Sequence, residues 1–331
     1  MGVNLHGRSL LTLLDYSTLE INYLLSLSHE LKKQKQISNT QCLLHGKNIV
    51  LVFNKPSTRT RCAFEVAITD ECGQVTYLAD SHLGYKESLE DTAKVLGRYF
   101  DGIAYRGDSQ LDAELLASFA GIPVWNALTD QYHPTQALAD IMTIQEHIEK
   151  PLYQIKLVYI GDGGNNVAHS LIVIAAKLGM QLTILGPESL RPNAGFINNI
   201  IAITQTTKAV IQFSTDVDNA INGADFIYTD VWVSMSETTE WQTRIELLKS
   251  YQVNQAMIDK TRNSHVKFMH CLPALHDEET SLAKTLAEEL GLHELEVTDQ
   301  VFRSKHSIVF EQAENRLHTI KAVVLATIGN I

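Results

Sequence analysis

The sequence lacks two features that would indicate a nucleic-acid or membrane partner: an excess of positive charge and a long hydrophobic run. Among its 331 residues, 27 lysines and arginines are outnumbered by 38 aspartates and glutamates, so the formal net charge is −11. Non-specific binding to nucleic acid or to a membrane surface requires an extended positive surface, so we expect neither partner. No segment approaches the roughly 18 uninterrupted apolar residues of a membrane span.

Closely spaced cysteines are also missing. The four cysteines, Cys42, Cys62, Cys72 and Cys271, form no Cys-x-x-Cys pair and no spacing typical of a zinc site. Scattered cysteines in an acidic chain suggest a reducing compartment. The apolar stretch near the N-terminus is interrupted at Asp15 and is too short for a signal peptide. We therefore expect a soluble, cytoplasmic protein.

What the sequence does contain is an alternating pattern that occurs twice. Short apolar runs alternate with amphipathic helical stretches, which is typical of parallel sheets with helices on both faces. We predict two doubly wound α/β domains, at 1–150 and 151–311, with a polar linker at 147–154 and the active site in the cleft between them. A last helix, at about 312–331, packs back onto the first domain. The predicted strands are 49–53, 75–78, 102–105, 122–125, 157–160, 181–185, 210–213, 226–229 and 266–270.

The stretch 47–70 indicates an anion site. The strand 49–53 is followed by a break and then by a helix for which Ser57 or Thr58 is the expected N-cap. The first N–H groups of a helix and its positive dipole end attract anions, and here two arginines, Arg59 and Arg61, lie beside them. The alternative is an ordinary capped helix with solvated arginines.

Other strand ends of the first half also carry polar residues. Ligands of open α/β sheets bind outside the carboxyl ends of the strands, so these residues are site candidates. Arg106 follows a strand and could hold a phosphate bidentately, or could be a surface arginine. His133 precedes Pro134 at a helix start, and Gln136 follows one turn on, so both could face one ligand, although a histidine there is often structural.

In the second half, the loop Gly161-Asp162-Gly163-Gly164-Asn165-Asn166 resembles a dinucleotide-binding turn but lacks the G-x-G-x-x-G spacing. Its two asparagines could instead hold a carboxylate. Asp230 ends an apolar strand and needs a cation, which could be a ligand ammonium group or a protein lysine or arginine. Cys271 is the cysteine at a strand end, where it is either an inert buried thiol or a substrate contact.

Taken together, these segments resemble the aspartate/ornithine carbamoyltransferase family, and the resemblance runs over nearly the whole chain in the right order. The motifs that carry it are Ser57-Thr58-Arg59-Thr60-Arg61 followed by Cys62-Ala63-Phe64-Glu65, His133-Pro134-Thr135-Gln136, Asp230-Val231-Trp232-Val233-Ser234-Met235, His270-Cys271-Leu272-Pro273 and Glu314-Asn315-Arg316.

The resemblance implies transfer of the carbamoyl group of carbamoyl phosphate to the δ-amine of L-ornithine, a step of arginine metabolism, with no cofactor and no metal. Arg106, His133, Asp230 and Cys271 would be the catalytic residues. The implied carbamoyl phosphate ligands are Ser57, Thr58, Arg59, Thr60, His82, Arg106, His133, Gln136, Cys271, Leu272 and Arg316. The implied ornithine ligands are Asn166, Asp230, Ser234 and Met235.

The family also implies a homotrimer or a multiple of it, because His82 lies on a loop that reaches a neighbouring subunit's site. Two positions depart from the family pattern: Ser236 replaces a glycine of the ornithine loop, and Gly164 stands where many members have arginine. Alternative readings are a carbamoyltransferase that acts on putrescine, aspartate or an acylated ornithine, and a non-catalytic homologue that only binds ligands.

Overall fold

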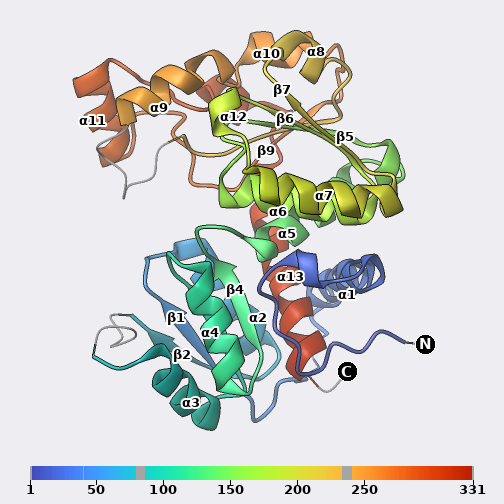
Figure 1. Cartoon of the computed structure of the whole chain (residues 1–331), viewed down its shortest axis with the longest axis vertical. Coiled ribbons are helices and arrows are strands. Elements are labelled where there is room, and N and C mark those ends of the chain that lie inside the picture. The colour runs from blue at the N-terminus through green and yellow to red at the C-terminus, as the bar shows by residue number, and fades with distance from the viewer. Residues whose placement is uncertain (1, 40, 80–85, 233–240, 330–331) are drawn as a thin grey trace. The chain divides into compact units, whose positions relative to one another are not determined.

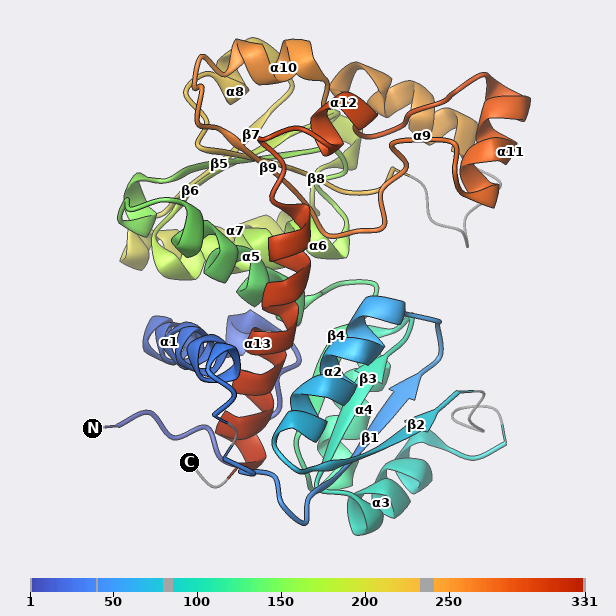
Figure 2. The ribbon, with the colours of Figure 1, turned by 180° about the vertical axis from the view of Figure 1, so that it is seen from behind.

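The structure is a computed structural model that describes residues 2–39, 41–79, 86–232 and 241–329. The chain divides into two compact units (Figures 1 and 2). Unit 1 comprises residues 1–146 and 313–331, and unit 2 comprises residues 147–312. Within the described residues, no helix is both long enough and apolar enough to cross a membrane.

Unit 1 is built on a parallel four-stranded sheet of order β2-β1-β3-β4 within the described chain. Figure 1 shows α4 in front of this sheet, and Figure 2, from behind, shows α2 in front of it, so helices cover both faces. The elements are α1 Thr18–Gln36, β1 Asn48–Phe53, α2 Thr58–Asp70, β2 Gln74–Leu78, α3 Leu89–Tyr99, β3 Gly102–Arg106, α4 Gln110–Ala120, β4 Val124–Leu128, α5 Pro134–His147 and most of α13 Val309–Ile328.

One face of this sheet packs against α3 and α4 through the branched side chains of its central strands, including Val50, Val52 and Ile103. The two helices approach closely because Gly97 has no side chain: a Cβ there would lie 1.8 Å from the carbonyl oxygen of Ala120. On the other face the indole Nε1 of Trp125 donates to Thr327 Oγ1 at 3.0 Å, which ties α13 to β4.

Unit 2 contains a parallel five-stranded sheet of order β7-β6-β5-β8-β9 within the described residues. Its elements are β5 Lys156–Ile160, α6 Asn166–Leu178, β6 Gln181–Leu185, α7 Ala194–Thr207, β7 Val210–Ser214, α8 Val217–Ile221, β8 Phe226–Thr229, α9 Trp241–Leu248, α10 Gln255–Lys260, β9 Lys267–His270, α11 Ser281–Leu290 and α12 Asp299–Phe302. Short 3₁₀ helices lie at Leu13–Asp15, Leu152–Gln154, Glu188–Leu190 and Lys249–Tyr251.

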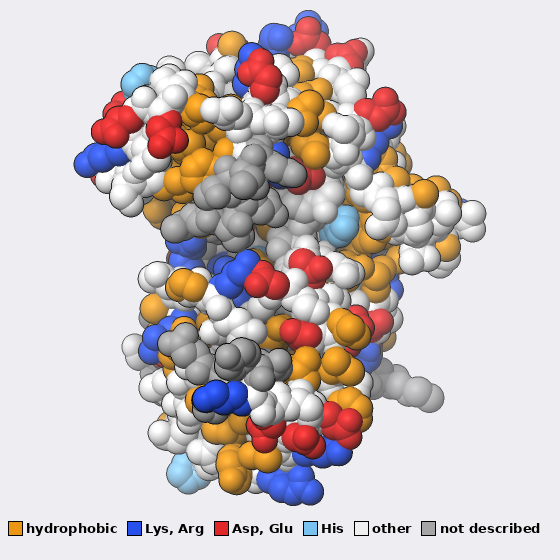
Figure 3. All heavy atoms as spheres, turned by 60° about the vertical axis from the view of Figure 1, so that its left-hand side comes forward, with side chains coloured by type: hydrophobic (Ala, Val, Ile, Leu, Met, Phe, Trp, Pro, Cys, Tyr) orange, Lys and Arg blue, Asp and Glu red, His pale blue; other side chains and the backbone are white. Residues whose placement is uncertain are grey.

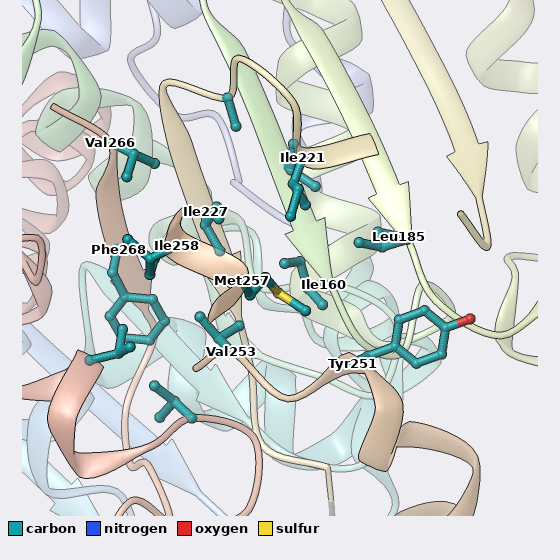
Figure 4. Close-up of a cluster of buried hydrophobic side chains, with 14 of the residues drawn as sticks. Ile160, Leu185, Ile221, Ile227, Tyr251, Val253, Met257, Ile258, Val266 and Phe268 are labelled. Atoms are coloured by element: carbon teal, nitrogen blue, oxygen red, sulfur yellow. The ribbon is translucent and has the colours of Figure 1, made fainter. Parts of the chain in front are cut away.

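The core on one face of the second sheet joins strand residues such as Ile160 and Phe268 to Ile221 of α8 and Met257 of α10 (Figure 4). Figure 1 shows α6 and α7 on the opposite face of that sheet. Two parallel sheets with helices on both faces confirm the predicted fold class. On the view in Figure 3, acidic and basic side chains are interspersed over the described surface.

A disulfide between Cys42 and Cys72, whose Cα atoms lie 4.8 Å apart, joins the turn before β1 to the turn after α2 in unit 1. The spacing of the cysteines did not predict this pair, because its members are 30 residues apart and meet only through the fold.

Candidate active site

In unit 1 the site residues collect where the strand order reverses. The connection from β1 leads outward to β2, and the next one returns to β3 on the other side of β1. The carboxyl ends of β1 and β3 therefore leave an open crevice between their helices, which is where open α/β sheets bind ligands. β1 leads to the start of α2, and β3 ends at Arg106.

The start of α2 has the form of an anion site. Ser57 occupies the N-cap position, as predicted, but its side chain makes no capping hydrogen bond. Thr60, in the first turn, is fully buried, and its Oγ1 accepts a hydrogen bond of 2.5 Å from Nη2 of Arg316 on α13. Two segments 256 residues apart in the sequence thus meet at this helix start.

Positive charge is concentrated around His133, which is 4% exposed. Burial, together with the positive charges of Arg316, Arg106 and Arg59, lowers the pKa of His133 well below 6.5. The imidazole is therefore neutral at physiological pH. Arginines from α2, β3 and α13 around one neutral histidine suit a ligand with more than one negative charge.

Gln136 brings an unused acceptor to the same region. Its Nε2 donates to Asp140 Oδ1 at 2.9 Å, which fixes the orientation of the amide. Its Oε1 is buried and has no hydrogen-bond partner among the described residues. A buried carbonyl oxygen of this kind suits a ligand that offers an N–H donor, since leaving it unpaired costs free energy.

Arg61 does not belong to this group, although it stands two residues after Arg59. Its Nε donates to Glu65 Oε1 at 2.8 Å, and its guanidinium lies 3.7 Å from the centroid of the Tyr77 ring. The arginines of the Ser-Thr-Arg-Thr-Arg motif therefore have different surroundings.

In unit 2 the order also reverses, here between β5 and β8. The loop after β5 ends at Asn165, the N-cap of α6, and Asn166 is the first residue of that helix. Asp230 follows β8 directly. Asp230 is 8% exposed, and burial raises the pKa of its carboxyl group. Its Oδ1 accepts hydrogen bonds from the Cys271 thiol at 2.9 Å and from the Val231 N–H at 2.8 Å.

No lysine or arginine among the described residues forms an ion pair with Asp230, so the cation that this carboxylate was expected to need is not one of those side chains. A ligand ammonium group remains the candidate. Cys271 is half-buried, and its contact with Asp230 places the thiol at this site rather than in an inert core.

A buried pair behind Cys271 holds the loop that carries it. Nδ1 of His270 accepts the Leu272 N–H at 2.9 Å, so in the neutral ring Nε2 carries the proton and faces Glu296 Oε1 at 3.4 Å. The same Glu296 oxygen accepts the Leu275 N–H at 2.6 Å. Both side chains are fully buried.

Two groups of side chains bring possible metal ligands together. Donor atoms of Asp230, His270 and Cys271 lie within 4.8 Å of one another. Nδ1 of His270 accepts the Leu272 N–H, whereas its Nε2 is buried 3.4 Å from Glu296 Oε1 without a hydrogen bond among the described residues. A second group, His276, Asp277 and Asp299, already has Arg303 paired with both of its carboxylates.

For some of the predicted ligands the structure gives the position in the backbone, and others lie outside the described residues. Asn166 is the first residue of α6, and Leu272 has a left-handed backbone with φ of 58° before a cis peptide bond to Pro273. His82, Ser234 and Met235, with the variant position Ser236, lie outside the described residues. Asn165, Tyr159 and Glu296 also take part, through contacts that the sequence did not predict.

Comparison with known proteins finds two family domains in succession along the chain. Residues 8–146 match the carbamoyl-P binding domain of aspartate/ornithine carbamoyltransferase, and residues 153–327 match its Asp/Orn binding domain. A catabolic ornithine carbamoyltransferase of Clostridium perfringens is 53% identical over 99% of this chain and 100% of its own length.

Solved structures are similar over the whole chain. The ornithine carbamoyltransferase of Pyrococcus furiosus has a TM-score of 0.90 at 40% identity, with both chains covered fully. The anabolic enzyme of Campylobacter jejuni has a TM-score of 0.85 at 32% identity, over 96% of this chain and 97% of its own. The chain belongs to the aspartate/ornithine carbamoyltransferase family, which confirms the predicted resemblance.

Proposed function

We propose that the protein transfers the carbamoyl group of carbamoyl phosphate to the δ-amine of L-ornithine, giving L-citrulline and phosphate, as a step of arginine metabolism. The proposal rests on the way that charged side chains are divided between the two units. Arginines surround His133 in the unit that matches a carbamoyl-P binding domain, and a buried carboxylate without a lysine or arginine partner among the described residues lies in the unit that matches an Asp/Orn binding domain.

On the carbamoyl phosphate side, the start of α2 (Ser57, Thr58, Arg59 and Thr60) holds the phosphate. Arg106 bridges phosphate and carbonyl oxygen, and Arg316 adds a further contact. Neutral His133 donates an N–H to the carbonyl oxygen. Gln136 Oε1 accepts from the carbamoyl NH₂ group, which satisfies an acceptor that is otherwise buried without a partner in the described chain.

On the amine side, Asp230 binds the α-ammonium group of ornithine and Asn166 binds its α-carboxylate. Ser234 and Met235 add further contacts. Cys271 and Leu272 line the site near the attacking amine, because the thiol is already hydrogen-bonded to Asp230.

The reaction follows from these groups. The neutral δ-amine attacks the carbamoyl carbon, a C–N bond forms, and the C–O bond to phosphate breaks with its electron pair leaving on phosphate. The proton lost by the amine ends on phosphate, so the products balance. Thr60, Arg106 and His133 stabilise the negative charge that develops on oxygen, and they do so without reorganising during the step.

We place the working assembly as a homotrimer or a multiple of it, with His82 contributed to a neighbouring subunit's site, and the protein in the cytoplasm. Light scattering on the purified protein tests the first point. The Cys42–Cys72 disulfide tests the cytoplasmic location, because a reducing cytosol would open it. Protein taken directly from cells would then have more titratable thiols than the oxidised protein.

The test is a colorimetric assay for ureido products with carbamoyl phosphate and each of four amines: L-ornithine, putrescine, N-acetylornithine and L-aspartate. We expect product with ornithine, and we expect Asp230→Asn to abolish most of it while the fold is kept. Product with another amine only would reassign the substrate. No ureido product with any amine would leave a ligand-binding homologue without activity.

A further inference from the structure

Asn165 uses both ends of its side-chain amide. As the N-cap of α6, its Oδ1 accepts the Ala168 N–H at 2.7 Å. Its Nδ2 donates to Tyr159 OH at 2.7 Å and to Asp230 Oδ2 at 3.3 Å. Because the oxygen is committed to the helix start, the NH₂ group can point only toward Tyr159 and Asp230.

The contact completes the surroundings of the Asp230 carboxylate. Oδ1 accepts from Cys271 and Val231, and Asn165 is the donor to Oδ2. Donors on both oxygens fix the plane of the carboxylate. Burial raises the pKa of the Asp230 carboxyl group, and the hydrogen bonds from Cys271 and Val231 lower it.

Tyr159 fixes Asn165 in turn. It is fully buried on β5, and its ring packs 5.8 Å from that of Tyr228 on the neighbouring strand β8. The phenol oxygen accepts one N–H of Asn165, so the second N–H is directed at Asp230. The donor is thus anchored by a helix start on one side and by the sheet core on the other.

We propose that Asn165 is a positioning residue for the amino-acid substrate: through its NH₂ group it holds the Asp230 carboxylate in the orientation that receives the substrate's ammonium group. Asn165 itself need not touch the substrate. The inference rests on the proposed function, since it assigns a role to a neighbour of the proposed ornithine ligand.

The competing explanation is that Asn165 only caps α6. Two substitutions separate these roles, because Asp and Ser are N-caps about as good as Asn. Asn165→Asp keeps the capping oxygen and the favourable charge at the helix start, but turns a carboxylate oxygen toward Asp230. Asn165→Ser keeps a capping oxygen and removes the donor without adding charge.

The matched control is Asn193, which caps α7 in the same unit through an N–H···Oδ1 bond from Phe196 of 2.9 Å. Among the described residues, no hydrogen bond joins Asn193 to Asp230. Asn193→Asp therefore makes the same chemical change at a cap that forms no hydrogen bond with the proposed substrate ligand among the described residues.

The experiment measures steady-state kinetics for both substrates, together with thermal unfolding, in the wild type and the three variants. We expect Asn165→Asp to raise KM for ornithine by about 10- to 100-fold, the loss expected for a hydrogen bond to a charged group, and Asn165→Ser to raise it by about tenfold. KM for carbamoyl phosphate and the unfolding temperature should stay close to the wild type, as should all parameters of Asn193→Asp.

An unchanged KM for ornithine in both Asn165 variants would overturn this inference and leave the proposed function standing. An equal rise of that KM in Asn193→Asp would have the same meaning. If the wild type forms no citrulline, the proposed function fails and this inference fails with it. Should Asn165→Asp not fold, Asn165→Ser still decides, because it adds no charge.

Discussion

At the scale of single residues, the site depends on the surroundings of each charged side chain. Arg59 and Arg61 are two residues apart on α2, yet Arg59 contributes to the positive charge around the neutral His133, while Arg61 is paired with Glu65. The motif alone predicts two equivalent cations. The fold assigns one to the candidate site and the other to a helix surface.

This difference can be measured with two variants. Arg59→Ala should raise KM for carbamoyl phosphate by about tenfold or more, since a charge-assisted hydrogen bond to phosphate is lost. Arg61→Ala removes an i,i+4 pair and should leave KM unchanged within error. Equal effects of the two substitutions would contradict the assignment.

Arg106 should act on the chemical step. Because it is held at the end of β3 and is assigned to the carbonyl oxygen as well as to phosphate, Arg106→Ala should lower kcat by roughly 10²-fold or more, like the loss of an oxyanion donor. The control is again Arg61→Ala. Near-normal turnover in Arg106→Ala would contradict the role of Arg106 in the chemical step.

His133 should make stability depend on pH in a defined direction. The unfolded chain protonates this histidine near pH 6.5, whereas the folded protein keeps it neutral to well below that value. Below about pH 6.5 the unfolded state therefore binds more protons, and the free energy of unfolding falls as pH drops. In His133→Gln this contribution is absent, so the fall between pH 7 and pH 5 should be smaller.

Urea unfolding at several pH values checks this prediction. Burial lowers the pKa of His318 to about 4, so this residue also makes stability fall as pH drops. It does so equally in the wild type and in His133→Gln, and its contribution therefore cancels in the difference between them. A fall of the same size in both proteins would show that His133 is not held neutral.

The residues that the sequence did not reveal are those whose role depends on a partner distant in the chain. Asn165 and Asn166 are adjacent and chemically identical, and only the start of α6 decides which of them turns its amide toward Asp230. Glu296 follows no predicted strand, and it reaches His270 from 26 residues away through the fold. By contrast, Arg106, Asp230 and Cys271 could be found because a strand end is visible in the sequence.

At the scale of elements, the predicted strands agree with the structure except at their ends. The strand predicted at 122–125 is β4, Val124–Leu128. Pro123 has no N–H, so the ladder with β3 begins at Val124, and the strand continues through Asn126, whose polarity obscured it. The last helix begins at Val309 rather than at 312.

An ion pair at the middle of α13 fixes this helix to unit 1. Lys321 is 2% exposed, and its Nζ lies 2.7 Å from Asp70 Oδ2 and 3.5 Å from Glu71 Oε1 at the end of α2. Removing one partner of a buried pair leaves an uncompensated charge, here above all on buried Glu71. The amphipathic pattern of α13 gave no sign of this buried charge.

Lys321→Met should therefore lower the free energy of unfolding by roughly 3–5 kcal/mol, as measured by urea denaturation. The control is Lys94→Met, which breaks an exposed i,i+4 pair with Glu90 and should change stability little. A Lys321→Met protein as stable as the wild type would mean that the pair contributes nothing net.

At the scale of the whole molecule, two sheets each offer the crevice where their strand order reverses, and the two crevices carry opposite charge. The sequence predicted both sheets and the polar residues at their edges. It could not predict the strand orders, which decide that Arg106 shares a crevice with the start of α2, and that Asp230 shares one with Asn165. One crevice therefore suits an anionic ligand, and the other suits a ligand that bears an ammonium group.

The most direct test uses ¹³C-labelled carbamoyl phosphate and ornithine labelled with ¹⁵N at the δ-amine, followed by NMR of the products formed by the purified protein. We expect a ureido carbon signal split by a one-bond coupling to ¹⁵N, which shows that the carbamoyl carbon has bonded to the δ-amine. A ¹³C label that appears only as cyanate, carbamate or bicarbonate, at the rate of the uncatalysed breakdown, would contradict carbamoyl transfer to ornithine.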